Sequence, residues 1–276
     1  MLGRLIKYEF KAGSKMFLLL YAALLFVSII NSILIYIGSG VDQSNVVLNA
    51  IQSIFMFGYV ILIVAVGIST LVLIIMRFYK NLLGDEGYLM FTLPVGTDSQ
   101  ILSKLITALI WTVLSALVMI ISIFIITAKY DPIYAVQNLF NEITSTGSNV
   151  YLGIAMIIIS FLIYMITTIM MFYAAMAIGP NLTKNRLLGS FLGYVIIYIA
   201  QQIVGIISIM IIYSSKFFSQ LSYMDTNSTL PAERLITLFD QIGIQLFIYI
   251  NTLNLIMAIA YYIITRFFLK NKLNLS

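Results

Sequence analysis

Long uninterrupted runs of apolar residues alternate with short polar segments along the whole chain. Six of these runs reach the length of about 20 residues that an α-helix needs to cross the hydrocarbon core of a membrane. Charged side chains occur in only two of them: Lys104 near the start of the third run and Arg266 at the end of the sixth. Both are placed where a long side chain can snorkel to the membrane surface. The pattern predicts membrane-spanning helices at 16–37, 51–76, 101–127, 150–178, 187–213 and 242–268.

The composition agrees with a chain dissolved in lipid rather than in water. Hydrophobic residues make up 62% of the chain and charged residues 9%, whereas a soluble domain has about 45–50% and about 25%. In lipid every backbone amide needs a partner within the protein, and the apolar runs are continuous instead of alternating, which favours helices over a membrane β-barrel. We therefore predict an all-α polytopic membrane protein, built as a single transmembrane domain over 1–276.

Lysine and arginine are distributed unevenly among the segments that connect the predicted spans. If the N-terminus is cytoplasmic, 12 of the 15 basic residues lie on the cytoplasmic side and 3 on the outer side, namely Lys129, Lys216 and Arg234. Because such a bias orients membrane proteins, we expect both termini in the cytoplasm and 214–241 as an external segment. The net charge of +5 is thus an orientation signal. Nucleic-acid binding is disfavoured, since the cations are divided among short segments.

The first fifteen residues form an amphipathic pattern ahead of the first span. On a helical wheel the apolar residues share one side and the basic residues share the other. This arrangement is typical of a helix that lies in the inner membrane interface with its cations toward anionic headgroups, and we predict such an interfacial helix at 1–15. Its apolar side holds Leu2, Leu5, Ile6 and Phe10, and its basic side holds Arg4, Lys7, Lys11 and Lys15.

Glu9 departs from this pattern. Its carboxylate falls in the middle of the apolar side, where a charge is costly unless it is paired. We therefore expect a basic partner, which is Arg77, Lys80 or a cation of another protein. The remainder of the interfacial helix needs no role beyond that of an anchor that satisfies the cytoplasmic bias of positive charge.

Several kinds of chemistry are excluded by what the chain lacks. It has no cysteine and no histidine, which removes thiol nucleophiles, imidazole bases and the usual zinc ligands. It contains no G-x-x-x-x-G-K-[ST] phosphate loop. The central parts of the six spans carry none of the ionisable groups that ion-coupled carriers need. We predict that the chain is not an enzyme and holds no cofactor of its own, so any uphill transport takes its energy from another polypeptide.

The segment between the second and third spans, RFYKNLLGDEGYLMFTLPV at 77–95, combines a charge cluster with an apolar run too short to cross a membrane. Gly84 is suited to end the preceding helix, Asp85 to cap a new one and Pro94 to stop it. The pattern predicts a short helix in the region 84–94 that displays apolar side chains on the cytoplasmic side. This helix either forms an interface with another protein or folds back, onto the lipid surface or under the helix bundle.

The same stretch resembles the first cytoplasmic loop of the six-helix permease subunits of ABC-2-type transporters from Gram-positive bacteria. The opening MLGRLIKYEFKA and the basic tail RFFLKNKLNL are also similar to that group. The resemblance implies that the short helix is a coupling helix, which inserts into a groove of a separate ATP-binding-cassette ATPase subunit that binds ATP and magnesium. The coupling residues would be Asp85, Glu86, Gly87, Tyr88, Leu89, Met90, Phe91 and Thr92.

The resemblance also implies how the assembly is built. The segment 1–15 would be the elbow that precedes the first span. Two permease subunits, identical or homologous, would work with two ATPase subunits in the bacterial cytoplasmic membrane. The absence of a phosphate loop from the sequence agrees with this division of labour, because the chain then depends on a partner for ATP hydrolysis.

A few amide side chains and a pair of glycines interrupt the apolar spans. Gly189 and Gly193, four positions apart, favour close packing of the fifth helix against a neighbour. The amides either form hydrogen bonds between helices or line the path of an amphipathic substrate between two permease subunits. They are Asn31, Gln201, Gln202, Gln245, Asn251 and Asn254.

Three functions are compatible with these features. The first is the transmembrane subunit of an ABC exporter, whose substrate would be a peptide or an amphipathic compound, on the resemblance alone. The second is a non-transporting membrane anchor or sensor that docks a cytoplasmic protein through Glu86–Thr92. The third is a passive or ion-coupled carrier. Association with a phosphate-loop ATPase separates the first from the other two.

Overall fold

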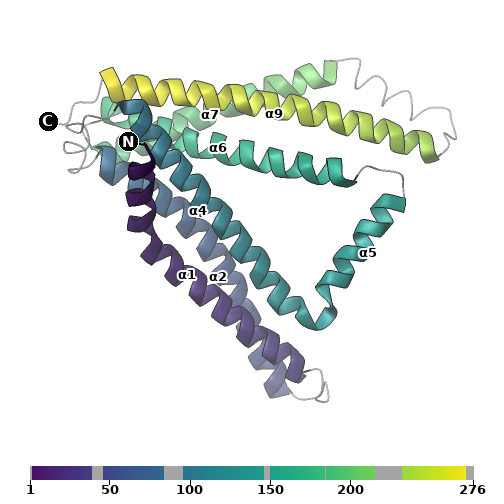
Figure 1. Ribbon diagram of the computed structural model, residues 1–276. Helices are drawn as coiled ribbons and strands as arrows, with labels where there is room; N and C mark the ends of the chain where they lie inside the picture. Colours follow the sequence, from purple (N-terminus) through teal and green to yellow (C-terminus); the bar gives the residue numbers. More distant parts are fainter. Residues whose placement is uncertain are drawn as a thin grey trace. The chain divides into compact units, whose positions relative to one another are not determined.

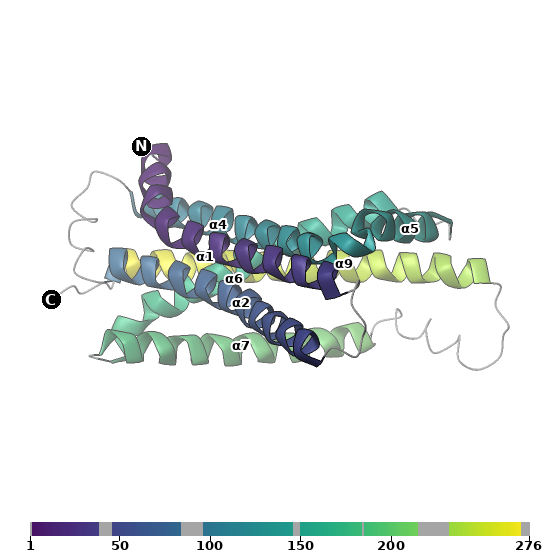
Figure 2. The same ribbon diagram turned by 90° about the horizontal axis from the view of Figure 1, so that it is seen from below.

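The computed structural model describes residues 2–38, 46–83, 96–145, 150–183, 185–214 and 232–271. These parts are almost entirely helical (Figures 1 and 2), which confirms the all-α fold class. Seven α-helices, one π-helix (η1) and one 3-10 helix (η2) follow one another along the described parts. They are α1 (Leu2–Gly38), α2 (Val46–Phe78), η1 (Tyr79–Leu83), α4 (Thr97–Ile126), η2 (Thr127–Tyr130), α5 (Pro132–Ser145), α6 (Val150–Leu182), α7 (Arg186–Ser214) and α9 (Ala232–Asn271).

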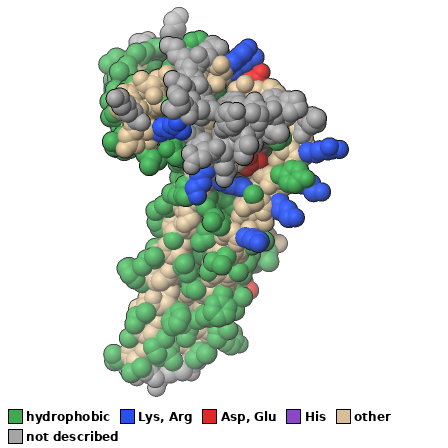
Figure 3. All heavy atoms as spheres, turned by 90° about the vertical axis from the view of Figure 1, so that its left-hand side faces the viewer, with side chains coloured by type: hydrophobic (Ala, Val, Ile, Leu, Met, Phe, Trp, Pro, Cys, Tyr) green, Lys and Arg blue, Asp and Glu red, His purple; other side chains and the backbone are tan. Residues whose placement is uncertain are grey.

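Six of these helices are long and apolar enough to cross a membrane, with mean hydropathy between 1.7 and 2.8 in their most apolar windows. They are α1, α2, α4, α6, α7 and α9, and they correspond one to one with the six spans expected from the sequence. No more than 22% of the residues in any of these windows are buried. Most apolar side chains therefore face outward, where lipid would cover them, and Figure 3 shows hydrophobic side chains over much of the helix surface. The chain is a membrane-embedded helical protein.

The N-terminal helix is longer than expected. The predicted interfacial helix 1–15 and the first span 16–37 are two parts of the single helix α1. Figure 2 shows the first turns of α1 set at a steep angle to the rest. Gly13 and Ser14 lie close to the junction of the two parts, and the Ser14 hydroxyl donates to the Lys11 carbonyl oxygen at 2.8 Å. Gly/Ser pairs are a common cause of helix bends, so the basic segment forms the bent arm of a continuous helix.

The last helix takes in part of the segment expected to lie outside the membrane. Residues from Ala232 onward form the first turns of α9, which continues without a break to Asn271. This helix has 40 residues and is thus about 60 Å long, at about 1.5 Å per residue. Because the hydrocarbon core is only about 30 Å thick, α9 reaches well beyond it.

The sequence analysis did not predict the helix that follows the third span. The 3-10 turn η2 continues α4, Asp131 adopts a left-handed conformation with φ of 45°, and α5 begins at Pro132. Aspartate is one of the few residues other than glycine that tolerate this conformation. Proline suits the first helical position, where no hydrogen-bond donor is needed. Together they turn the chain, and Figure 1 shows α5 leaving α4 at a steep angle.

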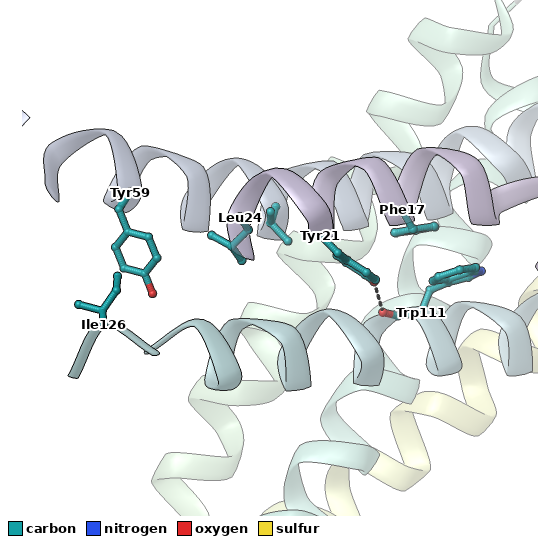
Figure 4. Packing of buried hydrophobic residues seen from close by; sticks show 7 residues of the cluster. Phe17, Tyr21, Leu24, Tyr59, Trp111 and Ile126 are labelled. Carbon is teal, nitrogen blue, oxygen red and sulfur yellow. Dashed lines mark hydrogen bonds between the residues drawn. The ribbon is translucent and has the colours of Figure 1, made fainter. Parts of the chain in front are cut away.

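The chain forms two compact units, Met1–Asn141 and Glu142–Ser276. In the first unit α1 packs along both α4 and α2, and in the second α6 packs against α7 and α9. Aromatic and branched side chains from α1, α2 and α4 interlock at the centre of the first unit (Figure 4). The buried members of this core are Phe17, Tyr21, Leu24, Tyr59, Val66, Trp111 and Ile126.

Hydroxyl groups join the three helices inside this apolar core. The Tyr21 hydroxyl lies 2.7 Å from Ser115 Oγ and donates to the Trp111 carbonyl oxygen at 3.2 Å (Figure 4). Ser115 Oγ in turn lies 2.9 Å from Thr70 Oγ1, which connects α1 to α4 and α4 to α2. A buried hydroxyl needs a partner in an apolar surrounding, so these contacts favour one register of the helices over others.

In the second unit α6 and α7 approach each other at backbone distance. A Cβ atom added to Gly193 would lie 2.5 Å from the Ala175 carbonyl oxygen, and one added to Gly179 would lie 2.5 Å from Ser190 N. A Cβ at Gly189 would meet the Gly179 carbonyl oxygen more closely still. The interpretation of Gly189 and Gly193 as residues of close helix packing is confirmed, because a side chain at either position would collide with the neighbouring backbone.

Candidate functional site: a buried ion-pair cluster

The first unit encloses a group of charged and polar side chains around Glu9, which is 8% exposed. Glu9 Oε1 accepts hydrogen bonds from Lys104 Nζ of α4 at 2.6 Å and from Asn81 Nδ2 of η1 at 3.1 Å. Glu9 Oε2 lies 3.8 Å from Arg77 Nη2 of α2. Arg77 Nη1 also donates to the backbone carbonyl oxygen of Glu9. We call Glu9, Arg77, Asn81 and Lys104 the Glu9 cluster.

One carboxylate therefore lies between two cations. The Lys104 side chain is 3% exposed and the Arg77 side chain is 22% exposed, so the lysine pair is shielded from water and the arginine pair is partly hydrated. Removing one member of a buried pair is destabilising because it leaves an uncompensated charge. Loss of Glu9 would remove the carboxylate from both ion pairs, whereas loss of either cation would leave one ion pair in place.

Two expectations from the sequence can be compared with this geometry. Glu9, for which we expected a basic partner, has Arg77 as one partner, while Lys80, the other candidate in this chain, is exposed. Lys104 does not snorkel to the surface as expected. It is buried because the Glu9 carboxylate lies within reach, and a paired, hydrogen-bonded ammonium tolerates burial far better than a lone one.

An aromatic stack lies close to the Glu9 cluster in the first unit. The Trp111 indole lies between the rings of Phe10 and Phe17, with centroid distances of 4.4 and 4.3 Å and nearly parallel planes. Gly13, on the same side of α1, leaves the space that Arg77 and Trp111 occupy: a Cβ there would lie 2.7 Å from Arg77 Nη1 and 3.3 Å from Trp111 Nε1. The ion pairs and the stack are thus parts of one packed assembly.

Two residues of this assembly that the sequence analysis missed, Gly13 and Phe17, carry a local signal. They follow Glu9 at intervals of four, which places all three on one face of α1. All three are buried. Gly13 is the member of this series that lets another helix approach closely, because glycine has no side chain. Asn81 had no comparable signal, since its role depends on the π-helical turn η1 that follows α2.

The basic residues of the predicted interfacial helix lie elsewhere. Arg4, Lys7, Lys11 and Lys15 are exposed, while Glu9 faces the interior. The two sides of the helical wheel are therefore distinct in the structure. The four exposed cations are not members of the Glu9 cluster and remain accessible to anionic headgroups.

The predicted coupling residues, 85–92, lie outside the described residues. The structure describes the chain on either side of them, up to Leu83 at the end of η1 and from Gly96, which precedes α4. Arg77 and Asn81 belong to the incoming arm, and Lys104 belongs to the outgoing arm. The Glu9 cluster consequently ties both arms of this connection to α1.

The amides within the spans fall into two groups. Asn31 donates to the carbonyl oxygen of Phe55 across to α2 at 3.1 Å. Asn251 donates to Ser160 Oγ at 2.8 Å, which joins α9 to α6. Gln201 Oε1 accepts from the Tyr261 hydroxyl at 3.3 Å, which joins α7 to α9. These three residues form hydrogen bonds between helices, as one of the two alternatives predicted.

The remaining amides differ. The Asn254 side-chain amide donates to the Ile250 backbone carbonyl oxygen within the same helix. The backbone carbonyl oxygen of Asn254 accepts a hydrogen bond from the Thr167 hydroxyl of α6. Gln202 and Gln245 are exposed on the outer surface of the second unit. Because a polar side chain that faces lipid is costly, these two positions are the ones among the six where a lining role stays open.

The chemistry of the site is that of ion pairing. Among the residues that the structure describes, no three His, Cys, Asp or Glu side chains come close enough together to hold a metal ion.

The fold and the site define a membrane-embedded protein with six potential spans and a buried ion-pair cluster that joins the first three of them. In the comparisons with known proteins, no family model, no curated protein and no solved structure matches the chain.

Proposed function

We propose that the chain is the transmembrane subunit of an ATP-binding-cassette transporter, which exports a peptide or another amphipathic compound and is driven by a separate ATPase subunit. It would act in the bacterial cytoplasmic membrane as one of two permease subunits, with both termini in the cytoplasm. The observation that carries the proposal is the Glu9 cluster, because it joins the two arms of the predicted coupling segment to a third helix.

A coupling segment transmits force only if its ends are held firmly. The arms of the segment 84–94 are held to α1 by contacts from Arg77, Asn81 and Lys104 to a single residue, Glu9. Such a tie makes α1, α2 and α4 move as one body when the segment is pushed. A loop that only connected two spans would need no buried charges, which are expensive to keep in a membrane protein.

The sequence supports the same assignment. The segment 77–95 resembles the coupling region of ABC-2 permeases, and the chain has no phosphate loop with which to bind ATP itself. Tyr88, Leu89 and Phe91 would fill a groove of the ATPase, as large apolar anchors do at the centre of interfaces. Asp85 and Glu86 would lie at the rim, where charges contribute less because solvent screens them.

The test is affinity purification of the tagged chain from membranes, with identification of any phosphate-loop ATPase that accompanies it. We expect the wild-type chain to retain such a subunit and the triple variant Tyr88→Ala, Leu89→Ala, Phe91→Ala to lose it. The matched control is Leu18→Ala, Leu19→Ala, Phe26→Ala, which removes three large, exposed apolar side chains from α1. This control should retain the ATPase, because its substitutions lie on a lipid-facing surface.

Other outcomes identify the alternatives. Retention of the ATPase by the coupling variant would show that the segment is not the coupling element. A wild-type chain that binds a cytoplasmic protein without a phosphate loop would be the anchor or sensor. Transport by the purified chain that needs an ion gradient and no ATP would identify a carrier.

A further inference from the structure

The helix α5 has a clear division into two faces, although it is too short to span a membrane. It has 14 residues, about 21 Å at about 1.5 Å per residue, against a hydrocarbon core of about 30 Å. On a helical wheel its apolar residues share one side: Ile133, Val136, Leu139 and Phe140. Gln137, Asn138, Asn141, Glu142 and Thr144 share the other.

The apolar face of α5 is exposed. Ile133 is 66% exposed, Val136 50% and Leu139 59%. In a chain whose spans already turn most of their apolar side chains outward, such a face is suited to lipid. In water it would be an aggregation-prone surface.

The connections of α5 place both its ends at a membrane surface. Its N-terminal end follows α4 after η2 and Asp131. Its C-terminal end, Ser145, is five positions from Val150, where the next potential span begins, and five extended steps cover at most about 18 Å. Because three potential spans precede α5, this surface is the one opposite the N-terminus.

The residues around the start of α5 are those of a membrane interface. Tyr130 and Tyr134 are 67% and 65% exposed, and the Lys129 ammonium lies 5.5 Å from the centre of the Tyr130 ring. Tyr151, in the first turn of α6, is also exposed. Tyrosine is enriched at the headgroup level on both sides of a membrane, and lysine snorkels there.

The first turns of α5 share a groove with the apolar side of the span before it. Ile133, Tyr134 and Gln137 of α5 line this groove of about 790 Å³, and they do so together with Ile120, Ile121 and Phe124 of α4. These three α4 side chains are exposed and belong to the part of the helix that lipid surrounds. The groove is therefore open to acyl chains from the same side as the lipid-facing surface of α4.

We propose that α5 is an interfacial helix, which lies on the membrane surface opposite the N-terminus with its apolar face among the lipid acyl chains and its polar face in water. The occupant of the apolar face is the bilayer itself. Helices that combine a distinct apolar face with a strongly polar face and low net hydrophobicity lie in the membrane interface in this way. The proposal does not depend on a transport function or on an ATPase.

The test uses nitroxide labels on single cysteines in the purified chain, reconstituted in phosphatidylcholine–phosphatidylglycerol vesicles. The native chain has no cysteine, so each label is unique. Val136→Cys and Leu139→Cys probe the apolar face, and Asn138→Cys probes the polar face. Ile121→Cys on α4 is the lipid control. Collision with oxygen, which concentrates in lipid, is compared with collision with a water-soluble nickel complex.

We expect the oxygen-to-nickel collision ratio to shift toward oxygen at 136 and 139, as at 121, and toward nickel at 138. Equal access of the nickel complex to all three α5 positions would overturn the proposal, because the helix would then stand in water. Labels at 136 and 139 that neither reagent reaches would also overturn it, since another protein surface or a second copy of the chain would then cover the face. Agreement between 136 and 139 guards against local distortion by one label.

Discussion

The Lys104 ammonium lies 2.6 Å from Glu9 Oε1, although the two residues are 95 positions apart in the chain, and both side chains are almost fully buried. This contact connects the first helix to the third potential span, with Arg77 of the second as an additional partner of the carboxylate. A buried pair is tolerated only while both members are present. The packing of α1 on α4 therefore depends on the side chains of both Glu9 and Lys104.

The first prediction concerns the loss of one member of this pair. Glu9→Gln should destabilise the protein by about 3–5 kcal/mol, the range for breaking a buried ion pair, because it removes the carboxylate with which both cations pair. Lys104→Met should cost less, since Arg77 still pairs with Glu9. Unfolding in mixed detergent micelles would measure both. Lys7→Met, which removes an exposed lysine from α1, is the matched control and should change stability little.

A double variant makes this prediction sharper. If the two residues interact as the structure indicates, the cost of Glu9→Gln with Lys104→Met should fall below the sum of the two single costs, by the roughly 0.5–3 kcal/mol typical of residues in contact. Simple additivity would mean that the pair contributes no coupling.

The second prediction uses Trp111, which is the only tryptophan in the chain, so that intrinsic tryptophan fluorescence reports on the stack alone. Gly13→Leu should push Arg77 and the indole apart, because even a Cβ would lie 2.7 Å from Arg77 Nη1. The emission maximum should move to longer wavelength as water enters. Gly3→Leu is the control, since no atom lies within 4 Å of a Cβ at that position. An unchanged spectrum in Gly13→Leu would contradict the tight packing described above.

The six long helices could be predicted because a span is a local property of the sequence. About 20 consecutive apolar residues indicate a membrane span, whichever helices they pack against. The joining of 1–15 to the first span in one helix was harder to foresee, since a bend at Gly13 and Ser14 and a break between two helices look alike in sequence. The helix α5 was not predicted because polar residues interrupt its apolar ones, so that no continuous apolar run marks it, although Asp131, Pro132 and the spacing of Ile133, Val136 and Phe140 all indicate a helix.

The site was only half predictable for a related reason. The local pattern of residues 1–15 is enough to place the Glu9 carboxylate on an apolar face, where a charge is costly unless it is paired. Glu9 could therefore be identified from the sequence, together with its need for a cationic partner. The choice of partner depends on how α1 is rotated against α2 and α4, which no local pattern records. Lys104 looked like a residue that snorkels because its distance from the helix end is compatible with both outcomes. Only the packing of α1 on α4 decides between them.

The third prediction concerns the close contact of α6 and α7. Gly193→Ala should destabilise the second unit by about 1–3 kcal/mol, as overpacking usually does, because the added Cβ would lie 2.5 Å from the Ala175 carbonyl oxygen. Gly205→Ala on the same helix meets no atom within 4 Å and should be neutral or stabilise by up to about 1 kcal/mol, since alanine favours the helix. Thermal unfolding of the two variants compares them directly. Equal effects would mean that the helices do not meet at Gly193.

The fourth prediction concerns orientation in the membrane. Twelve of the 15 basic residues fall on one side if six spans are counted from a cytoplasmic N-terminus, and the positive-inside bias then orients the chain. In intact cells an impermeant thiol reagent should label Ser44→Cys, Ser145→Cys and Ser222→Cys. It should not label Gly3→Cys, Thr183→Cys or Ser276→Cys until the membrane is permeabilised, and that later reaction shows that those cysteines are accessible. Since the native chain has no cysteine, no background labelling is expected. Labelling of the second set in intact cells would show that the chain has the opposite orientation. The two arms held by the Glu9 cluster would then lie on the outer side, where no ATPase could reach them.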